Sequence, residues 1–339
     1  MTIYTISKQE GIVYALQVSD GTLLWQQNIG QKLTGALAAS ISVIYTGSYD
    51  GYVYAMQAYD GSLLWRYSTG SDVPYPPMRT DTQSVYFGSP GGIYALRARD
   101  GSLLWHFSTP GCKTCSNAVA AISDGIIYAF LDGLYALRAS DGQVLWYDSR
   151  FRLTPAYLVV MNRKVYVPTG KQDQLCILRA NDGQQMHLLP GGNMIATDGM
   201  LYVNNGDKEL YAVNTRDDAL VWRTSEVTLQ VSAASNETIY STSSAVGLPS
   251  MSDSDSLVAK RSPTTSGQTN VYGLRANDGS LKWHWQLPYA MGISSHPLIV
   301  EGNIVFITGG VMYTLRESDG SELWHSMREK PFSSDPVGI

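Results

Sequence analysis

YALRARDGSLLW, residues 94–105, joins two short apolar runs through Asp100-Gly101 and recurs along the whole chain. Both runs are rich in aromatic and aliphatic residues, as strands are, and an Asp-Gly dipeptide suits the tight turn of a hairpin. Eight copies occur, and two are altered: one ends on His187 in place of tryptophan, and residues 211–222 have lost the turn glycine. The turn aspartates of the eight copies are Asp20, Asp60, Asp100, Asp141, Asp182, Asp217, Asp278 and Asp319.

The period of this repeat predicts the architecture. Successive turn aspartates are 40, 40, 41, 41, 35, 61 and 41 residues apart. Each copy follows a further strand-like run, such as the one ending in Ile44-Tyr45, and a still earlier run of small residues, as in 117–121 and 231–235. Four strands per period of about 40 residues, without the 3.6-residue spacing of helical repeats, indicate the blades of a propeller. We therefore predict an all-β, eight-bladed β-propeller of four-stranded antiparallel blades.

The two ends of the chain are predicted to close the ring. Asp319 lies 20 residues before Ile339, and Asp20 is the twentieth residue, so the ends together supply one period. Residues 333–339 match the small-residue run, and we expect them to pair with the N-terminal strand in a composite first blade, built from 333–339 and 2–27. Such pairing would leave no free inner edge. Residues 1–339 would then form a single propeller domain, with an insertion at 245–268 in blade 7.

The tryptophans that end the repeat are predicted to be structural. A large flat ring on an outer strand can fill the space between blades that widens away from the axis, and its loss typically costs about 3–5 kcal/mol. Restoring the repeat by His187→Trp should stabilise the fold or be neutral, unless the site has repacked around the smaller ring. The seven tryptophans are Trp25, Trp65, Trp105, Trp146, Trp222, Trp283 and Trp324.

Composition narrows the classes of partner. A net charge of −5 offers no basic face and argues against nucleic acid. No 18-residue apolar run exists, so direct membrane insertion is not expected, and the N-terminus lacks the layout of a signal peptide. Because a blade strand begins within a residue or two of Met1, we expect a domain excised from a larger bacterial protein. We also expect it to be a monomer. The compartment is left open, with an extracytoplasmic domain as one alternative.

The spacing of Ala95, Gly101 and Trp105, together with the sequence pattern of residues 45–56, resembles the repeat of pyrroloquinoline-quinone (PQQ)-type propellers. That family includes quinoprotein alcohol dehydrogenases, an outer-membrane assembly lipoprotein and sensor domains fused to bacterial protein kinases. The resemblance covers practically the whole chain and is specific for fold, whereas a propeller hosts many activities. Two positions of the repeat differ from the dehydrogenases. Just before the glycine the dehydrogenases have Thr, whereas this chain has Asp. Two residues after the alanine the dehydrogenases have Asp. At that second position this chain has Gln17, Gln57, Arg97, Arg138, Arg179, Asn214, Arg275 and Arg316.

An enzymatic role is the weaker alternative. The resemblance would imply PQQ with Ca²⁺, adjacent cysteines joined beside the quinone, a Glu/Asn/Asp ligand set and a catalytic Asp. This chain has no adjacent cysteine pair, and no calcium ligand maps onto it residue by residue. Glycine-rich phosphate loops and the zinc-protease and serine-hydrolase signatures are also missing. We therefore expect no catalytic residues, cofactor or metal, and we keep a PQQ-binding oxidoreductase domain as the alternative.

Cysteines and histidines supply the first candidates for a binding site. Cys112 and Cys115 form a CxxC that is half a zinc site or a local disulfide or thiol pair closing a loop. Cys176 takes a position of the repeat that should be packed inside a blade. His296 differs from the others, because it lies on an innermost strand and could face the central channel beside Asp335. The remaining histidines, His106, His187, His284 and His325, fall on the outer strand of the repeat.

The insertion at 245–268 supplies the other candidates, Asp253 and Asp255, in a Ser-, Thr- and Asp-rich segment that could also be a plain solvated loop. It should open on the same face as Cys112 and Cys115, opposite the nearly uniform Asp-Gly turns. Binding sites gather on variable loops of rigid scaffolds. We therefore predict a non-catalytic recognition or sensor scaffold that binds an unknown protein or small ligand through this face. A purely structural ring that contacts proteins by its rim is the third alternative.

Overall fold

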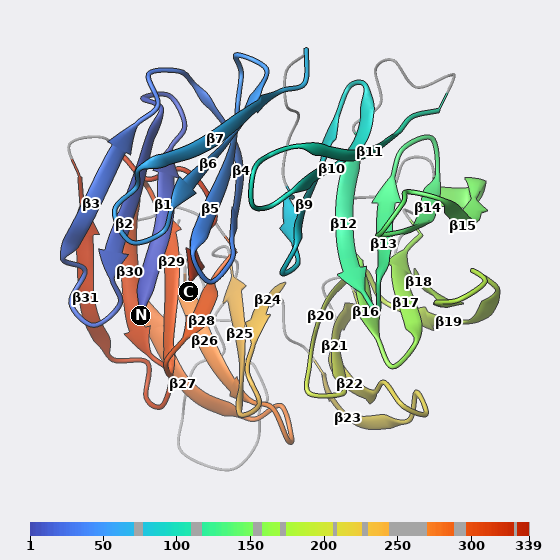
Figure 1. Ribbon diagram of the computed structural model, residues 1–339. Coiled ribbons are helices and arrows are strands. Elements are labelled where there is room, and N and C mark those ends of the chain that lie inside the picture. Colours follow the sequence, from blue (N-terminus) through green and yellow to red (C-terminus); the bar gives the residue numbers. More distant parts are fainter. Residues whose placement is uncertain are drawn as a thin grey trace.

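The computed structural model consists of eight four-stranded antiparallel sheets (Figure 1). It describes residues 1–70, 77–109, 117–151, 158–169, 174–205, 209–225, 230–243, 270–287, 296–328 and 331–338. Apart from the short 3₁₀ helix η1 (Ser149–Phe151), the regular elements in these residues are strands. The predicted eight-bladed, all-β propeller is confirmed.

In each blade the strands follow one another outward from the axis. The innermost strands are β32 (Val337–Gly338), β4 (Leu33–Ala39), β8 (Arg79–Thr80), β12 (Ala118–Ser123), β16 (Val159–Met161), β20 (Asn193–Thr197), β24 (Gln230–Ala234) and β28 (Leu298–Val300), for blades 1 to 8. The second strands are β1 (Thr2–Ser7), β5 (Val43–Ser48), β9 (Ser84–Ser89), β13 (Ile126–Phe130), β17 (Lys164–Pro168), β21 (Met200–Asn205), β25 (Thr238–Ser243) and β29 (Asn303–Thr308).

The repeated sequence forms the two outer strands. The third strands are β2 (Ile12–Gln17), β6 (Tyr52–Gln57), β10 (Gly92–Arg97), β14 (Leu134–Arg138), β18 (Gln174–Arg179), β22 (Glu209–Asn214), β26 (Asn270–Arg275) and β30 (Val311–Arg316). The outermost strands are β3 (Leu23–Asn28), β7 (Leu63–Ser68), β11 (Leu103–Phe107), β15 (Val144–Asp148), β19 (Gln185–Pro190), β23 (Leu220–Ser225), β27 (Leu281–Gln286) and β31 (Glu322–Met327). The second and third strands are almost fully buried, because neighbouring blades cover both of their faces.

The two faces of the ring differ in the loops they carry. The turns between first and second strands lie beside the Asp-Gly turns, as the bond from the Ala98 N–H to the Gln83 carbonyl (2.8 Å) shows in blade 3. An equivalent bond occurs in every blade. We call this side the turn face. The opposite side, the connection face, carries the links between second and third strands and between successive blades.

A β-bulge protects the outer edge of each blade. In blade 3, Ala95 is opposite Trp105 and Leu96 is opposite Leu103, so Leu104 has no partner in the ladder. The same register shift occurs in all eight blades. Bulges twist an edge strand and hinder its pairing with another chain.

Tryptophans join consecutive blades. The Trp105 indole N–H donates to the Ala139 carbonyl of the next blade (2.8 Å), and the ring lies on Gly142, where a β-carbon would stand 2.7 Å from Cε3. Gly142 also has a positive φ of 72°, so the turn and the close contact both require glycine. Seven joints share this contact: Trp25 with Gly61, Trp65 with Gly101, Trp105 with Gly142, Trp146 with Gly183, Trp222 with Gly279, Trp283 with Gly320, and Trp324 with Gly21.

The predicted closure is present, with a shorter ladder than residues 333–339 would allow. Ile3 pairs with Gly338 and Tyr4 with Val337. Upstream of β32, the Ser333 N–H donates to the Ile6 carbonyl (2.8 Å) in place of further strand pairing. The marks for the two ends of the chain accordingly lie close together in Figure 1. Blade 1 is therefore composite, as the sequence predicts.

Candidate functional site

A charged pair lies at the axial mouth of the connection face. His296 precedes the innermost strand β28, and Asp335 precedes β32, so the chain brings both to the same end of the central channel. The backbone N–H of His296 donates to Oδ1 of Asp335 (2.8 Å), and its Nδ1 lies 2.9 Å from Oδ2. The His296 side chain is 85% exposed. The structure thus brings these two residues together in a place that a ligand can reach.

The pair has coupled electrostatics. The hydrogen bond to Asp335 raises the pKa of His296 above its usual value, against an opposing effect of burial. Partial burial would raise the pKa of Asp335, but the hydrogen bond and charge of His296 outweigh it and lower that pKa. Both shifts favour the charged forms, so the mouth presents an imidazolium beside a carboxylate over the pH range between the two groups' usual pKa values.

Lys8 completes this cluster, although no sequence pattern marks it as a site residue. Lys8 follows β1 on the connection face, and its backbone N–H donates to Ser333 Oγ (2.7 Å). Its side chain lies over Gly35 in β4, where a β-carbon would stand 2.5 Å from Cε of the lysine. Its charge also lowers the pKa of Asp335. Since Lys8 lies just outside the repeated sequence, its role depends on the composite blade and could be found only with the closure known.

Four of the predicted site residues, Cys112, Cys115, Asp253 and Asp255, lie outside the described residues, as does the insertion 245–268 itself. The strand β25 ends and the strand β26 begins on the connection face of blade 7. Cys176 is a free, buried thiol in β18, as expected, and burial raises its pKa. It therefore belongs to the core.

The joint between blades 5 and 6 is altered on both sides. His187 replaces the tryptophan, and Asp218 replaces the glycine with a φ of +58°. His187 Nε2 lies 3.2 Å from Asp218 Oδ2, Lys164 Nζ lies 2.6 Å from the same oxygen, and the Tyr166 hydroxyl donates to Oδ1 (3.1 Å). The site has thus repacked around the smaller ring. Because Asp218 now fills the space of the glycine, His187→Trp alone should not be neutral.

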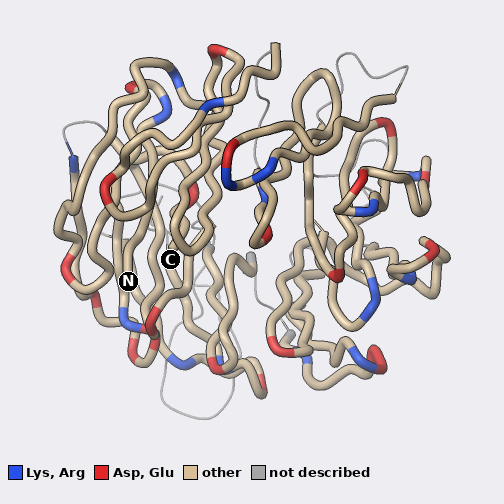
Figure 2. Tube along the Cα trace, in the orientation of Figure 1, with Lys and Arg blue, Asp and Glu red and all other residues tan. Residues whose placement is uncertain are grey.

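The turn face has a repeated pattern of charge. Figure 2 shows the charged residues mainly at the ends of strands. Arginine at the end of the third strand pairs with the turn aspartate in four blades: Arg97–Asp100, Arg138–Asp141, Arg179–Asp182 and Arg316–Asp319, at 2.8–3.5 Å. This pairing gives a local reason for arginine where the quinoprotein repeat has aspartate. Being exposed, the pairs contribute little to stability.

Within the described residues, no three His, Cys, Asp or Glu side chains gather closely enough to hold a metal ion. The same residues contain no helix long and apolar enough to cross a membrane. The sequence has no adjacent cysteine pair.

Eight radial sheets, joined at seven of their eight interfaces through Trp-Gly contacts, define the chain as a β-propeller. A family model described as outer membrane protein assembly factor BamB, of the PQQ-like repeat, matches residues 9–224 and 151–290. The chain therefore belongs to the PQQ-like propeller family. No curated protein matches it significantly.

Solved structures of low sequence identity share the fold. BamB from Moraxella catarrhalis has a TM-score of 0.60 at 15% identity, over 93% of this chain and 88% of that one. The computationally designed Ika8 protein reaches 0.66 at 13% identity, over 90% of both chains. A quinohemoprotein alcohol dehydrogenase from Pseudomonas putida HK5 reaches 0.63 at 11% identity, over 98% of this chain and 69% of that one. These likenesses concern architecture alone.

Proposed function

We propose that this propeller is a non-catalytic recognition scaffold that binds a protein partner through its connection face. One observation carries the proposal. The turn face repeats one kind of turn, with the same Arg–Asp pair in four of its eight blades, whereas the axial mouth of the connection face holds a cluster of residues outside the repeated sequence: His296, Asp335 and Lys8. Selective binding needs a surface that differs from place to place, and a rigid ring can present one. The match to the BamB family model agrees with an interaction role.

The proposal can be tested by site-specific photocrosslinking in the native host. Tyr49 and Tyr59 are exposed tyrosines of the same blade, one in the connection-face link between β5 and β6 and one beside the Asp-Gly turn on the turn face. A benzophenone amino acid at Tyr49 should give a discrete adduct, and the same group at Tyr59 should give none. Adducts from Tyr59 alone, or equal adducts from both, would contradict the proposal.

A second variant connects the axial mouth to that adduct. His296→Ala removes an exposed side chain and should weaken the crosslink from Tyr49 with little change in the melting temperature, because 85% of the side chain is already in solvent. Glu301→Gln, on the turn face of the same blade, is the matched control and should leave the crosslink intact. An unchanged crosslink in His296→Ala would remove the mouth from the proposed surface.

We also propose that the scaffold acts without a quinone. Titration of the protein with PQQ and Ca²⁺, followed by calorimetry and absorbance, should show no tight binding, and dye-linked alcohol oxidation should be absent. Binding of the quinone with a Kd below about 1 µM would instead favour the oxidoreductase alternative.

A further inference from the structure

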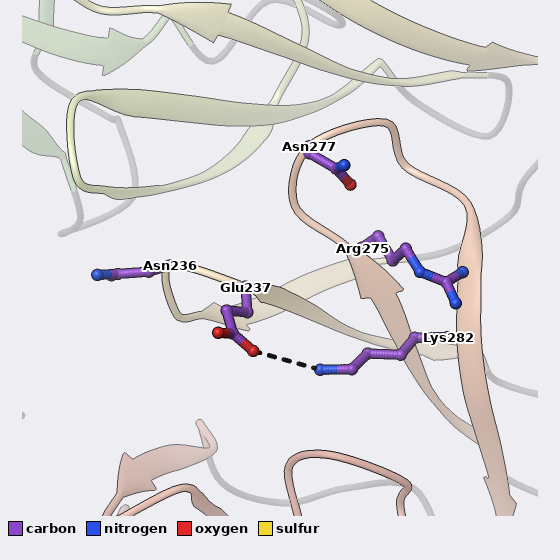
Figure 3. A pocket seen from close by; sticks show the side chains of 5 residues that line it. All are labelled: Asn236, Glu237, Arg275, Asn277 and Lys282. Carbon is purple, nitrogen blue, oxygen red and sulfur yellow. Dashed lines mark ion pairs between the residues drawn. The ribbon is translucent and has the colours of Figure 1, made fainter.

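An open hollow lined by polar and charged residues lies on the turn face of blade 7, away from the surface proposed above. Its volume is about 300 Å³, and it is lined by Asn236, Glu237, Arg275, Asn277 and Lys282. Figure 3 shows Lys282 extending toward Glu237, while Arg275 and Asn277 come from the end of β26 and the turn that follows it. The hollow is therefore built from the same three elements that every other blade contains, which makes the other blades internal controls.

Lys282 differs in type from the residues at the same position of the other blades. It is the bulged residue of β27, and the corresponding residues are apolar in the other blades: Leu24, Leu64, Leu104, Leu145, Met186, Val221 and Leu323. Instead of lying in solvent, its side chain is only 18% exposed. Its ammonium donates to Thr238 Oγ1 (2.9 Å) and lies 3.9 Å from Glu237 Oε2. The substitution thus places a cation where the repeat has an exposed aliphatic side chain.

Arg275 is a second departure in the same place. Its four counterparts form ion pairs with the aspartate three residues later, whereas Arg275 makes no ion pair within 4.0 Å among the described residues. Its Nη1 donates instead to Ser280 Oγ (3.2 Å) and to the Leu281 carbonyl (3.0 Å). The charge of Arg275 helps to lower the pKa of Asp278, but a guanidinium that no carboxylate contacts directly still has N–H groups that can bind an anion.

The opposite charge is supplied by Glu237. Its side chain is 83% exposed, and its contact with Lys282 is long and solvated. Such a pair contributes little and can be exchanged for a ligand at small cost. Asn236 and Asn277 add carboxamides, each of which can donate and accept hydrogen bonds. The hollow therefore combines two cations, one available carboxylate and two amides.

We propose that this hollow binds a small zwitterion, of the class of the free α-amino acids. A ligand with only a negative charge would be repelled by Glu237 and by the neighbouring Asp278, and a ligand with only a positive charge would be repelled by Arg275 and Lys282. A carboxylate directed to the two cations and an ammonium directed to Glu237 satisfy both sets of groups. A volume of about 300 Å³ is at the small end of ligand sites and suits a molecule of this size.

The first test is a titration of the intact chain with each of the twenty common amino acids, followed in ¹H–¹⁵N spectra through the side-chain amides of Asn236 and Asn277. At least one amino acid should shift both amides with a Kd of about 1 mM or tighter. Its N-acetyl derivative and its carboxamide should each bind at least about ten-fold more weakly, because each lacks one charge. Equal binding of these derivatives, or no binding by any amino acid below about 10 mM, would overturn the proposal.

Two variants and two matched controls locate the site. Lys282→Leu restores the residue of the repeat, and Glu237→Gln changes an exposed side chain, so both should melt as the parent does while binding at least about ten-fold more weakly. Glu301→Gln and Arg316→Gln change the equivalent turn and strand end of blade 8 and should leave binding unchanged. Retained binding in Lys282→Leu, or equal losses in the controls, would refute this site. The outcome is independent of the crosslinking test, which probes the opposite face.

Discussion

Seven joints between blades are apolar and one is charged. At the seven, an indole ring lies on a glycine that leaves no room for a β-carbon. At the joint of blades 5 and 6, histidine and aspartate take their places. Lys164, whose side chain is only 10% exposed, donates a hydrogen bond to Asp218, and His187 lies 3.2 Å from the same carboxylate. The two solutions fill the same space. The difference indicates that the ring and the glycine are the two halves of one contact, and we expect that they can change together but not separately.

The largest loss of stability is expected when the tryptophan ring is removed from one of the seven apolar joints. Trp105→Ala should lower the free energy of unfolding by about 3–5 kcal/mol, because it removes a buried ring and the hydrogen bond to the Ala139 carbonyl. Chemical denaturation followed by circular dichroism measures this change. His187→Ala is the comparison at the charged joint and should cost less, because Lys164 and Tyr166 still satisfy Asp218. Equal costs would mean that the two joints do not differ as described.

A slightly smaller effect is expected from breaking the charged joint. Asp218→Asn keeps the shape of the side chain and tolerates the positive φ, but it leaves the Lys164 ammonium without its carboxylate. We expect a loss of about 2–4 kcal/mol in denaturation experiments, since removing one member of a nearly buried pair leaves an uncompensated charge. Asp217→Asn, on the exposed side of the same turn, should cost far less. A neutral Asp218→Asn would show that the pair is not structural.

The effect of His187→Trp on the free energy of unfolding should change sign with the residues that surround position 187. In the parent protein, His187→Trp should destabilise by about 1–3 kcal/mol, because the ring meets Asp218. In a background of Asp218→Gly and Lys164→Met, the same substitution should stabilise, since the glycine contact becomes possible and no lysine is left unpaired. A coupling free energy of at least about 1 kcal/mol is expected from this cycle. Additive free energies would disprove the two-sided contact.

The smallest effect concerns a histidine–aspartate pair in solvent. At His296 and Asp335, the raised histidine pKa gives a stabilising contribution that is lost as pH rises through that pKa. The lowered aspartate pKa gives one that is lost as pH falls through it. The contact should thus be strongest between the usual values of 3.8 and 6.5, and worth less than about 1 kcal/mol because it is exposed. In NMR titrations, Asp335→Asn should lower the pKa of His296, whereas Asp100→Asn should not.

Much of the fold follows from the sequence, because a repeat of about 40 residues reports the same local structure many times. Blade number, strand order and the composite first blade were all predictable from the turn aspartates and the small-residue runs. The bulge was not, since Leu104 looks like any other apolar strand residue until its missing partner in the ladder is seen. The brevity of β32 was also hidden, because the Ser333 N–H and side chain replace strand pairing there.

The sites were harder to predict, for a physical reason. His187 and the missing glycine at 218 are 31 residues apart in the chain, and each alone resembles decay of the repeat. Only the packing of one blade on the next brings them into contact. Lys282 can be noticed in the sequence, because it is charged where the equivalent residues of the other repeats are apolar. Its significance, however, depends on Arg275 and Glu237, which line the same hollow.

The meeting of Ile3 with Gly338 also has a consequence for biosynthesis. During translation, β1 emerges 335 residues before its innermost partner, which at about 5–20 residues per second is an interval of roughly 17–67 s. Throughout that interval the inner edge of β1 offers unpaired amides and carbonyls to any other extended chain. We expect nascent chains to be most vulnerable to aggregation then, and most dependent on chaperones that cover strand edges. Two residue pairs at the centre of the ring thus decide how long the growing chain is exposed.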